Sequence, residues 1–290
     1  MKSANALLAK KQLLEIFVRY RVDSPYPGDW ESIFKGSGYE FWALRELEAT
    51  DSWQHIDWKA TARTGRYYVR EYLAESYFDL MLLYDMSKSV ALGRKDDLQA
   101  NIAVALAYSA VSSNNGCGLI MFADEVITYL PPQMGWPHFL QIVAAIAQAA
   151  PVQCRQTNLH AALTKLVTET PESLTFILSD FLYPCECGYN FQRTSAGTNK
   201  HEVTAIQVLE EWELALPPDS QGVLPLYDYE SGARILLDLS KWQIYNDAMQ
   251  NTIRQQQSLL QKAGIPLLTM TPADDFVQKI NEFMLRRDRK

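Results

Sequence analysis

From residue 78 onward, short apolar runs alternate with stripes of apolar residues at helical spacing, and this alternation constrains the fold more than any other feature. Residues 78–84 form a nearly continuous apolar run, which is typical of a strand buried on both faces of a sheet. Similar runs lie at residues 118–122, 174–178, 203–209 and 265–270. Helical spacing follows the first run, at Leu98, Ile102, Ala105 and Leu106. Strands separated by helices predict an α/β fold with a doubly wound, mainly parallel sheet.

Two further segments predict antiparallel strands. Residues 126–130 closely follow the second apolar run, so we expect a short hairpin partner that ends at the prolines 131–132. Residues 224–227 and 233–237 predict a β-hairpin insertion, because both are apolar and a Glu-Ser-Gly turn lies between them.

Residues 1–74 lack this alternation and carry clustered aromatic, glycine and charged residues instead. We interpret them as an N-terminal extension packed on the core, not as an independent domain. Residues 75–290 then form the α/β domain, which is long enough to bury a full core.

Charge and composition exclude several classes of protein. A net charge of -7 disfavours a general nucleic-acid-binding protein, which requires a basic surface. The 4 cysteines are too few for a disulfide scaffold. No uncharged apolar stretch reaches the roughly 20 residues that cross a bilayer. We therefore expect a cytoplasmic protein with no transmembrane segment.

A group of hydroxyl and carboxylate side chains stands at the predicted strand ends. Asp85, Ser87 and Ser89 lie just beyond the first apolar run, where ligands bind in open α/β sheets. From a tight loop, one carboxylate and two hydroxyls can face one point, and such hard oxygen ligands suit Mg²⁺ or Mn²⁺. Thr157 precedes a predicted helix and Asp180 ends a predicted strand, so both can complete the ligand shell. These five residues form the candidate metal site.

Two alternatives compete with metal binding at this loop. Asp and Ser are common at strand-to-helix turns simply as helix caps. A phosphohydrolase of the haloacid dehalogenase type also has an aspartate at its first strand end, but it needs a second carboxylate two residues later. This chain has Ser87 at that position, and it has no P-loop and no Gly-x-Ser-x-Gly motif. We therefore expect no catalytic residues.

The strand-end pattern resembles the metal-ion-dependent adhesion site (MIDAS) of von Willebrand factor type A domains. Upstream, the run Ile56-Asp57-Trp58-Lys59-Ala60-Thr61-Ala62-Arg63 resembles the bacterial family catalogued as domain of unknown function 58 (DUF58), whose members are type A-like. The resemblance extends from about residue 36 to the C-terminus. Residues 49–53 depart from it, because they replace the family's more usual glycine-aspartate turn.

The resemblance implies how the site works. Ser87, Ser89 and Thr157 would bind the metal directly, whereas Asp85 and Asp180 would act wholly or partly through water. It also implies a protein-interaction role with a MoxR-class AAA+ ATPase, in chaperone-like assembly or maturation of a client protein. Because two carboxylates neutralise Mg²⁺, an open position would remain for an acidic side chain of the partner.

Two other functions stay open from the sequence. Basic residues between Lys59 and Arg70, interleaved with aromatic residues, can form a surface for single-stranded nucleic acid. The acidic balance of the chain instead favours a structural role for this segment, with Ile56 and Trp58 packed. A scaffold that has this fold but holds no metal is the third possibility.

Overall fold

The computed structural model describes residues 40–47, 56–73, 78–152, 157–170, 172–183, 201–218, 221–227 and 234–287. The chain divides into two compact units, one of Pro25–Phe78 and one of Asp79–Lys290 with Met1–Ser24. The division of the chain at residue 74, with the preceding residues packed on the core, stays a prediction.

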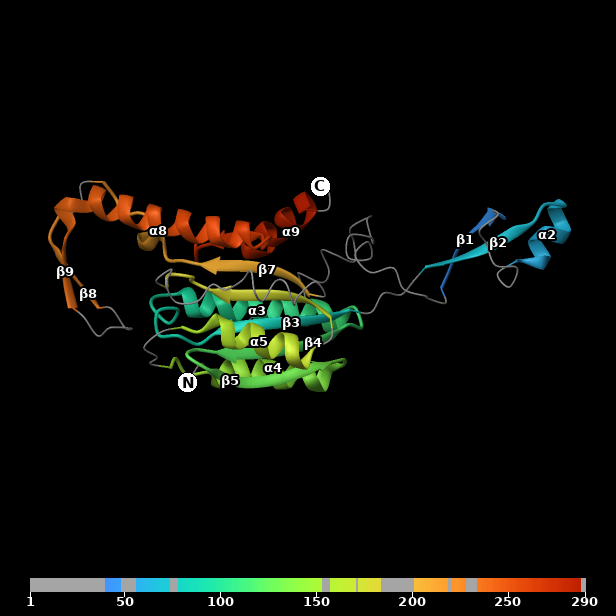
Figure 1. The fold of residues 1–290 in the computed structure, drawn as a ribbon, viewed down its shortest axis with the longest axis horizontal. Coiled ribbons are helices and arrows are strands. Elements are labelled where there is room, and N and C mark those ends of the chain that lie inside the picture. Colours follow the sequence, from blue (N-terminus) through green and yellow to red (C-terminus); the bar gives the residue numbers. More distant parts are fainter. Residues whose placement is uncertain are drawn as a thin grey trace. The chain divides into compact units, whose positions relative to one another are not determined.

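A six-stranded sheet forms the centre of the larger unit (Figure 1). Its strands are β3 (Asp79–Asp85), β4 (Gly116–Phe122), β5 (Val126–Gln133), β6 (Ser173–Ser179), β7 (His201–Val208) and β10 (Leu267–Met270). The order is β10-β7-β6-β3-β4-β5, and only β4 and β5 pair antiparallel. The chain runs from β3 to β4 on one side and later returns to β6 on the other, so the order reverses at β3. This topology confirms the predicted doubly wound, mainly parallel sheet.

Helices cover both faces of this sheet. They are α3 (Lys95–Ser112), α4 (Trp136–Gln148), α5 (Leu159–Glu169), α8 (Trp242–Lys262) and α9 (Phe276–Arg287), with the short α7 (Glu211–Leu214) after β7. Met81 and Leu83 share a core cluster with residues of α5 and α8. Side chains alternate along a strand, so the equally buried Leu80 and Leu82 face the other side, where α3 contacts β3, β4 and α4. Figure 1 shows α8 and α9 running along the β7 side of the sheet.

The edge strand β5 is longer than the sequence pattern predicts. It continues through Pro131 and Pro132 to Gln133, which pairs with Cys117 of β4. Proline has no N–H to donate to a neighbouring strand, but an edge strand has a neighbour on one side only and tolerates the loss. The expected end of the strand at these prolines is therefore wrong.

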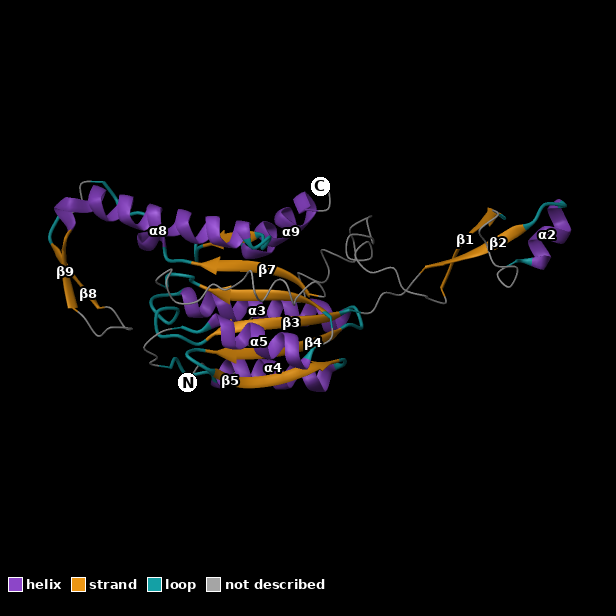
Figure 2. Cartoon of the chain, viewed as in Figure 1, coloured by secondary structure: helices purple, strands orange, loops and turns teal. Residues whose placement is uncertain are grey.

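The predicted hairpin insertion is confirmed. β8 (Val223–Tyr227) and β9 (Arg234–Asp238) pair antiparallel, with Val223 opposite Asp238. The hairpin lies beyond the first turn of α8 and apart from the six-stranded sheet (Figure 2).

Both C-terminal helices begin differently from the sequence pattern, which favours Ser240 and Thr271 as N-caps. Asp238 accepts hydrogen bonds from the N–H and the hydroxyl of Ser240, at 3.0 and 2.7 Å, and starts a 3-10 turn that precedes α8. Asp275 accepts from the backbone of the first turn of α9, at 3.0 and 3.2 Å. Thr271 donates instead to Asp274. Asp238 thus caps the 3-10 turn before α8, and Asp275 caps the first turn of α9.

The smaller unit contains β1 (Glu40–Glu46), α2 (Trp58–Thr64) and β2 (Tyr68–Leu73), with β1 and β2 antiparallel. Asp57 caps α2 by accepting from the backbone N–H groups of Lys59 and Ala60, at 2.9 and 3.0 Å. Ile56 is buried, as predicted, whereas Trp58 is 63% exposed. The expected packing of the Trp58 side chain is therefore wrong.

Candidate metal centre

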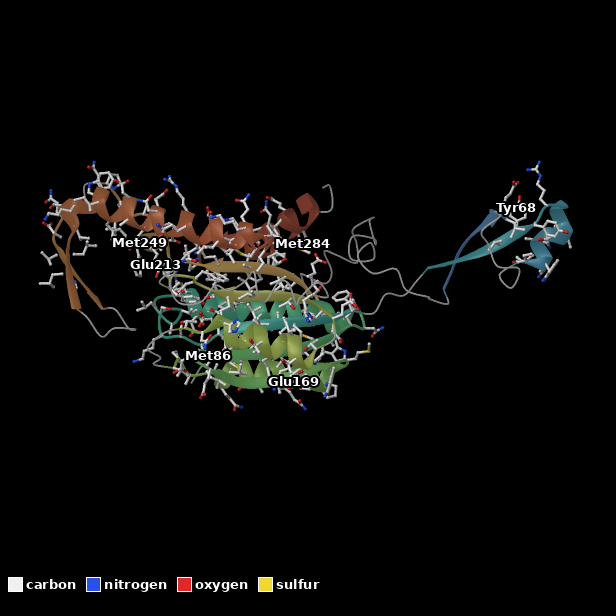
Figure 3. All side chains as sticks on the ribbon, viewed as in Figure 1. Tyr68, Met86, Glu169, Glu213, Met249 and Met284 are labelled. Carbon is white, nitrogen blue, oxygen red and sulfur yellow. The ribbon has the colours of Figure 1, made fainter. Side chains whose placement is uncertain are left out.

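The candidate site lies where the strand order reverses, which is the usual place for ligands in doubly wound sheets. Asp85 is the last residue of β3, and Asp180 follows Ser179, the last residue of β6. Figure 3 labels Met86 and Glu213, and both lie at the end of the sheet toward which β7 points. Because β3 and β6 pair parallel, the predicted ligands at the ends of these two strands lie at the same edge of the sheet.

Uncharged donors hold the side chain of Asp85. Its Oδ1 accepts a hydrogen bond from the N–H of Ser87 at 2.8 Å, and its Oδ2 accepts from the hydroxyls of Ser179 at 2.6 Å and Tyr183 at 2.7 Å. Asp85 is 1% exposed. Burial raises the pKa of Asp85 to about 6, and the negative charge of Asp180 adds to that rise. The three hydrogen bonds oppose the rise without cancelling it.

Ser87 and Ser89 place two hydroxyls side by side, with their Oγ atoms 3.0 Å apart. Neighbouring segments fix the backbone of this loop. The N–H of Met86 donates to the carbonyl of Phe122 at 2.7 Å, and the Met86 carbonyl accepts from Val152 at 2.8 Å. The turn is therefore tied to β4 on one side and to the segment after α4 on the other.

The predicted ligands next to helices do not cap them. α3 begins only at Lys95, and its N-cap residue, Arg94, makes no side-chain capping bond within the described chain. α5 is capped by Asn158, whose Oδ1 accepts from Ala161 at 3.1 Å, and not by Thr157. Capping of α3 or α5, the main alternative to metal binding at this loop, is therefore excluded for Asp85, Ser87, Ser89 and Thr157.

Thr157 brings a third hydroxyl, and this hydroxyl has no hydrogen-bond partner among the described residues. The residue is only 1% exposed. The next residue, Asn158, donates to the carbonyl of Ala123 at 2.7 Å, and Ala123 follows Phe122, which pairs with Asp85 across β3 and β4. An unpaired buried hydroxyl costs about 1–3 kcal/mol. This oxygen is therefore available to a ligand.

Asp180 differs from Asp85 because its partner carries a full charge. Asp180 and Lys95, the first residue of α3, are both fully buried, and Nζ of Lys95 lies 3.2 Å from Oδ2 of Asp180. The same ammonium donates to Oε1 of Glu213 at 2.7 Å. Burial alone would lower the pKa of Lys95, but the two carboxylates outweigh it and the net effect raises that pKa. Lys95 is therefore a buried cation inside the candidate site.

Sequence reasoning missed four residues that hold the two aspartates in place: Ser179, Tyr183, Lys95 and Glu213. One signal was available, because Glu210 and Glu213 have the spacing of a capping box and form one at α7. No comparable pattern marks the other three residues.

The three hydroxyls and two carboxylates of the site are oxygen donors of the kind that bind a hard divalent cation. The structure gathers the three residues after β3 in one hydrogen-bonded turn. Thr157 is linked to that turn through β4, and Asp180 is linked through Ser179, which donates to Asp85. Metal binding at these residues stays a prediction.

A family model described as "Protein of unknown function DUF58" matches residues 43–258. Two uncharacterized proteins, from Mycobacterium bovis and Mycobacterium tuberculosis, are each 28% identical over 295 residues, and each match covers 98% of this chain and 90% of the relative. The predicted departure from the family at residues 49–53 lies outside the described residues.

Solved structures with a similar fold include the conserved hypothetical protein BatB from Bacteroides thetaiotaomicron, at 14% identity and a TM-score of 0.48. That match covers 73% of this chain and 98% of BatB. A von Willebrand factor type A structure from Catenulispora acidiphila matches at 10% identity and a TM-score of 0.41, over 77% of this chain and 44% of its own. Among the described residues, no helix is both long enough and apolar enough to span a membrane.

Proposed function

The chain belongs to the DUF58 family, as the run from Ile56 to Arg63 predicted, and we propose that it is a Mg²⁺-dependent protein-interaction module. The observation that carries this proposal is the unpaired, buried hydroxyl of Thr157 beside the Asp85 turn. The hydroxyl of Thr170 is equally buried and unpaired, but Thr170 lies before the start of β6, whereas the candidate site lies at the end of that strand. The position of Thr157 therefore makes its oxygen available to an ion at the site.

The chain's own oxygens supply the ligand set. Ser87, Ser89 and Thr157 would hold the ion directly, and Asp85 and Asp180 would act through water, as the resemblance to type A domains implies. When bound, the ion supplies an open coordination position that an acidic side chain of a partner can fill. Mn²⁺ has the same preference for oxygen ligands and would replace Mg²⁺.

The same contacts favour binding over catalysis. Both oxygens of Asp85 already accept hydrogen bonds from the protein, so this carboxylate is not poised as a nucleophile. Ser87 stands where a phosphohydrolase would need its general acid. Lys95 pairs with two carboxylates and is shielded from solvent, so its ammonium group is not accessible to a substrate.

The partner that we propose is a MoxR-class AAA+ ATPase, together with a client protein that presents the acidic side chain. Support for this pairing comes from the DUF58 resemblance. The chemistry of the site supports the acidic contact, because a divalent cation with an open coordination position attracts carboxylates.

The test of metal binding compares two buried threonines of similar environment. Thr157 precedes α5 and Thr170 follows it, and the hydroxyl of each is buried and unpaired among the described residues. Mg²⁺ at about 100 times its dissociation constant should stabilise the wild type by about 2.7 kcal/mol in urea unfolding. Thr157→Val should abolish this stabilisation, whereas Thr170→Val should retain it. Equal stabilisation of both variants would contradict Thr157 as a ligand, and no stabilisation of the wild type would contradict a metal site and leave the metal-free scaffold.

The test of the partner uses a purified MoxR-class ATPase from the same organism, without nucleotide. We expect the wild type and Thr170→Val to bind it with Mg²⁺ and to lose binding in EDTA. Thr157→Val and Asp85→Ala should not bind under either condition. Identical binding by all four proteins in EDTA and Mg²⁺ would rule out a metal-dependent contact.

A second candidate function follows from the exposure of Trp58. Trp58 is 63% exposed and Tyr67 is 51% exposed, and the basic Lys59 and Arg63 are exposed nearby on α2. Exposed aromatic rings stack on bases while basic side chains contact phosphates, so this face suits a single-stranded nucleic acid. Oligo-dT binding that weakens with salt and disappears in Trp58→Ala would support this function. Absence of binding at low salt would remove it.

A further inference from the structure

The candidate metal site contains a cation of its own. Lys95 is among the largest side chains that the fold buries completely, and its Nζ lies 2.7 Å from Glu213 and 3.2 Å from Asp180. Long charged side chains are almost never buried without a specific partner, and here the lysine has two. Three segments meet at this ammonium: the end of β6, the start of α3 and the turn of α7.

The surrounding backbone holds this arrangement in one geometry. Oε2 of Glu213 accepts from the N–H of Glu210 at 2.8 Å, and the Glu210 carboxylate in turn accepts from the N–H of Arg94. Gly93 has a φ of +68°, and a Cβ added there would clash with Oε1 of Glu210. The turn at Gly93, just before Lys95, therefore favours glycine, and Gly93 packs directly against Glu210.

The positive charge of Lys95 affects how Asp180 can bind a divalent ion. Asp180 is a predicted ligand of that ion, and it already pairs with Lys95. A second cation at this carboxylate meets the ammonium across a buried, weakly screened distance, so the two repel each other. When no ion is bound, the same ammonium neutralises Asp180 and keeps it from being a buried, unpaired charge.

We propose that Lys95 is the resident cation of the site and sets its affinity for divalent metal. It keeps the metal-free site intact, and it weakens metal binding enough to make it reversible. This inference rests on the proposed metal-dependent function and describes how that function is regulated. The β6 end of the site accordingly has two electrostatic states. In one, Lys95 alone balances the charge of Asp180, and in the other Asp180 is shared between Lys95 and the metal.

Two substitutions that change the local charge in opposite directions test the proposal. Lys95→Met removes one positive charge and should tighten Mn²⁺ binding, measured by electron paramagnetic resonance, at least tenfold. Glu213→Gln removes one negative charge, leaves Lys95 with Asp180 alone, and should weaken Mn²⁺ binding. Lys165→Met is the matched control, because Lys165 lies on α5 and pairs with Glu169 near the surface at 2.9 Å. Its Mn²⁺ affinity should equal that of the wild type.

The outcomes separate this inference from the proposed function. Equal affinities in the wild type, Lys95→Met and Glu213→Gln would overturn the role of Lys95 and leave the metal site standing. Binding by Lys95→Met alone would support the role of Lys95, and it would show that the wild type works without metal. Binding by no variant would overturn both. If Lys95→Met does not fold, Glu213→Gln still tests the inference. Weaker Mn²⁺ binding by Glu213→Gln supports the role of Lys95, and unchanged or tighter binding contradicts it.

Discussion

The ends of β3 and β6 each place one buried aspartate at the same edge of the sheet, but they compensate its charge in different ways. Asp85, after β3, is surrounded by a backbone N–H and two hydroxyls. Asp180, after β6, lies against the ammonium of Lys95. Neutral donors orient a carboxylate but leave its negative charge unbalanced, whereas the positive charge of a lysine balances it. The β3 end is therefore the part of the site whose negative charge calls for an added cation.

The largest change in the free energy of unfolding is expected from a substitution at the β6 end. Lys95→Met leaves Asp180 and Glu213 buried without a counter-charge, and breaking a buried ion pair in this way costs about 3–5 kcal/mol. Urea unfolding in EDTA measures the loss. Lys165→Met, which breaks a surface pair, should cost less than about 1 kcal/mol. Similar costs for the two variants would mean that Lys95 is not needed to neutralise the β6 end.

A somewhat smaller effect, dependent on pH, is expected at the β3 end. Asp85 has a pKa of about 6 in the folded chain, whereas in the unfolded chain its pKa is the ordinary 3.8. The free energy of unfolding should therefore fall as pH rises between these two values and then stay level. The difference corresponds to about 3 kcal/mol.

Asp85→Asn isolates this contribution, because the amide cannot ionise and its oxygen can still accept from Ser87. In EDTA the variant should be more stable than the wild type at pH 7.5 by up to about 3 kcal/mol, with the difference vanishing near pH 4. Urea unfolding across this range measures both curves. Parallel curves for the wild type and Asp85→Asn would show that Asp85 is as well compensated as Asp180.

The smallest effect concerns one of the neutral donors. Tyr183→Phe removes one hydrogen bond to the Asp85 carboxylate and should lower the free energy of unfolding by about 1.5 kcal/mol at pH 7.5. It should also raise the pKa of Asp85 further, because one of the opposing hydrogen bonds is lost. Tyr108→Phe is the control, since Tyr108 packs edge-to-face on Trp136 and Phe139 and keeps those ring contacts as phenylalanine. Equal losses in the two variants would contradict a special role for the Tyr183 hydroxyl.

The sequence predicts the positions of both aspartates, because each ends or follows an apolar run that is typical of a buried strand. It does not predict how they are compensated. Lys95 stands beside Asp96 and Asp97 at the start of a helix, a setting that usually indicates a solvated charge. Its burial depends on Glu213, which is 118 residues away in the sequence and reaches Lys95 only once β7 lies beside β6.

Local signals at chain turns are ambiguous for a related reason. Ser240 and Thr271 have the chemistry of N-caps, but an aspartate close to each in the sequence takes part in the turn instead. Several side chains in such a turn can accept the same backbone hydrogens, and tertiary packing selects among them. The existence of a helix is therefore easier to predict than its first residue.

The two prolines of β5 have a consequence for how copies of this protein meet in a crowded solution. Pro131 and Pro132 lie where the pairing of β4 and β5 shifts register, and neither has an N–H to donate to a further strand. A strand from another molecule that tried to extend the sheet there would meet a gap in the ladder. Interruptions of this kind protect exposed sheet edges from edge-to-edge aggregation. The prolines that fail to stop the strand within the molecule thus serve to stop the sheet from growing between molecules.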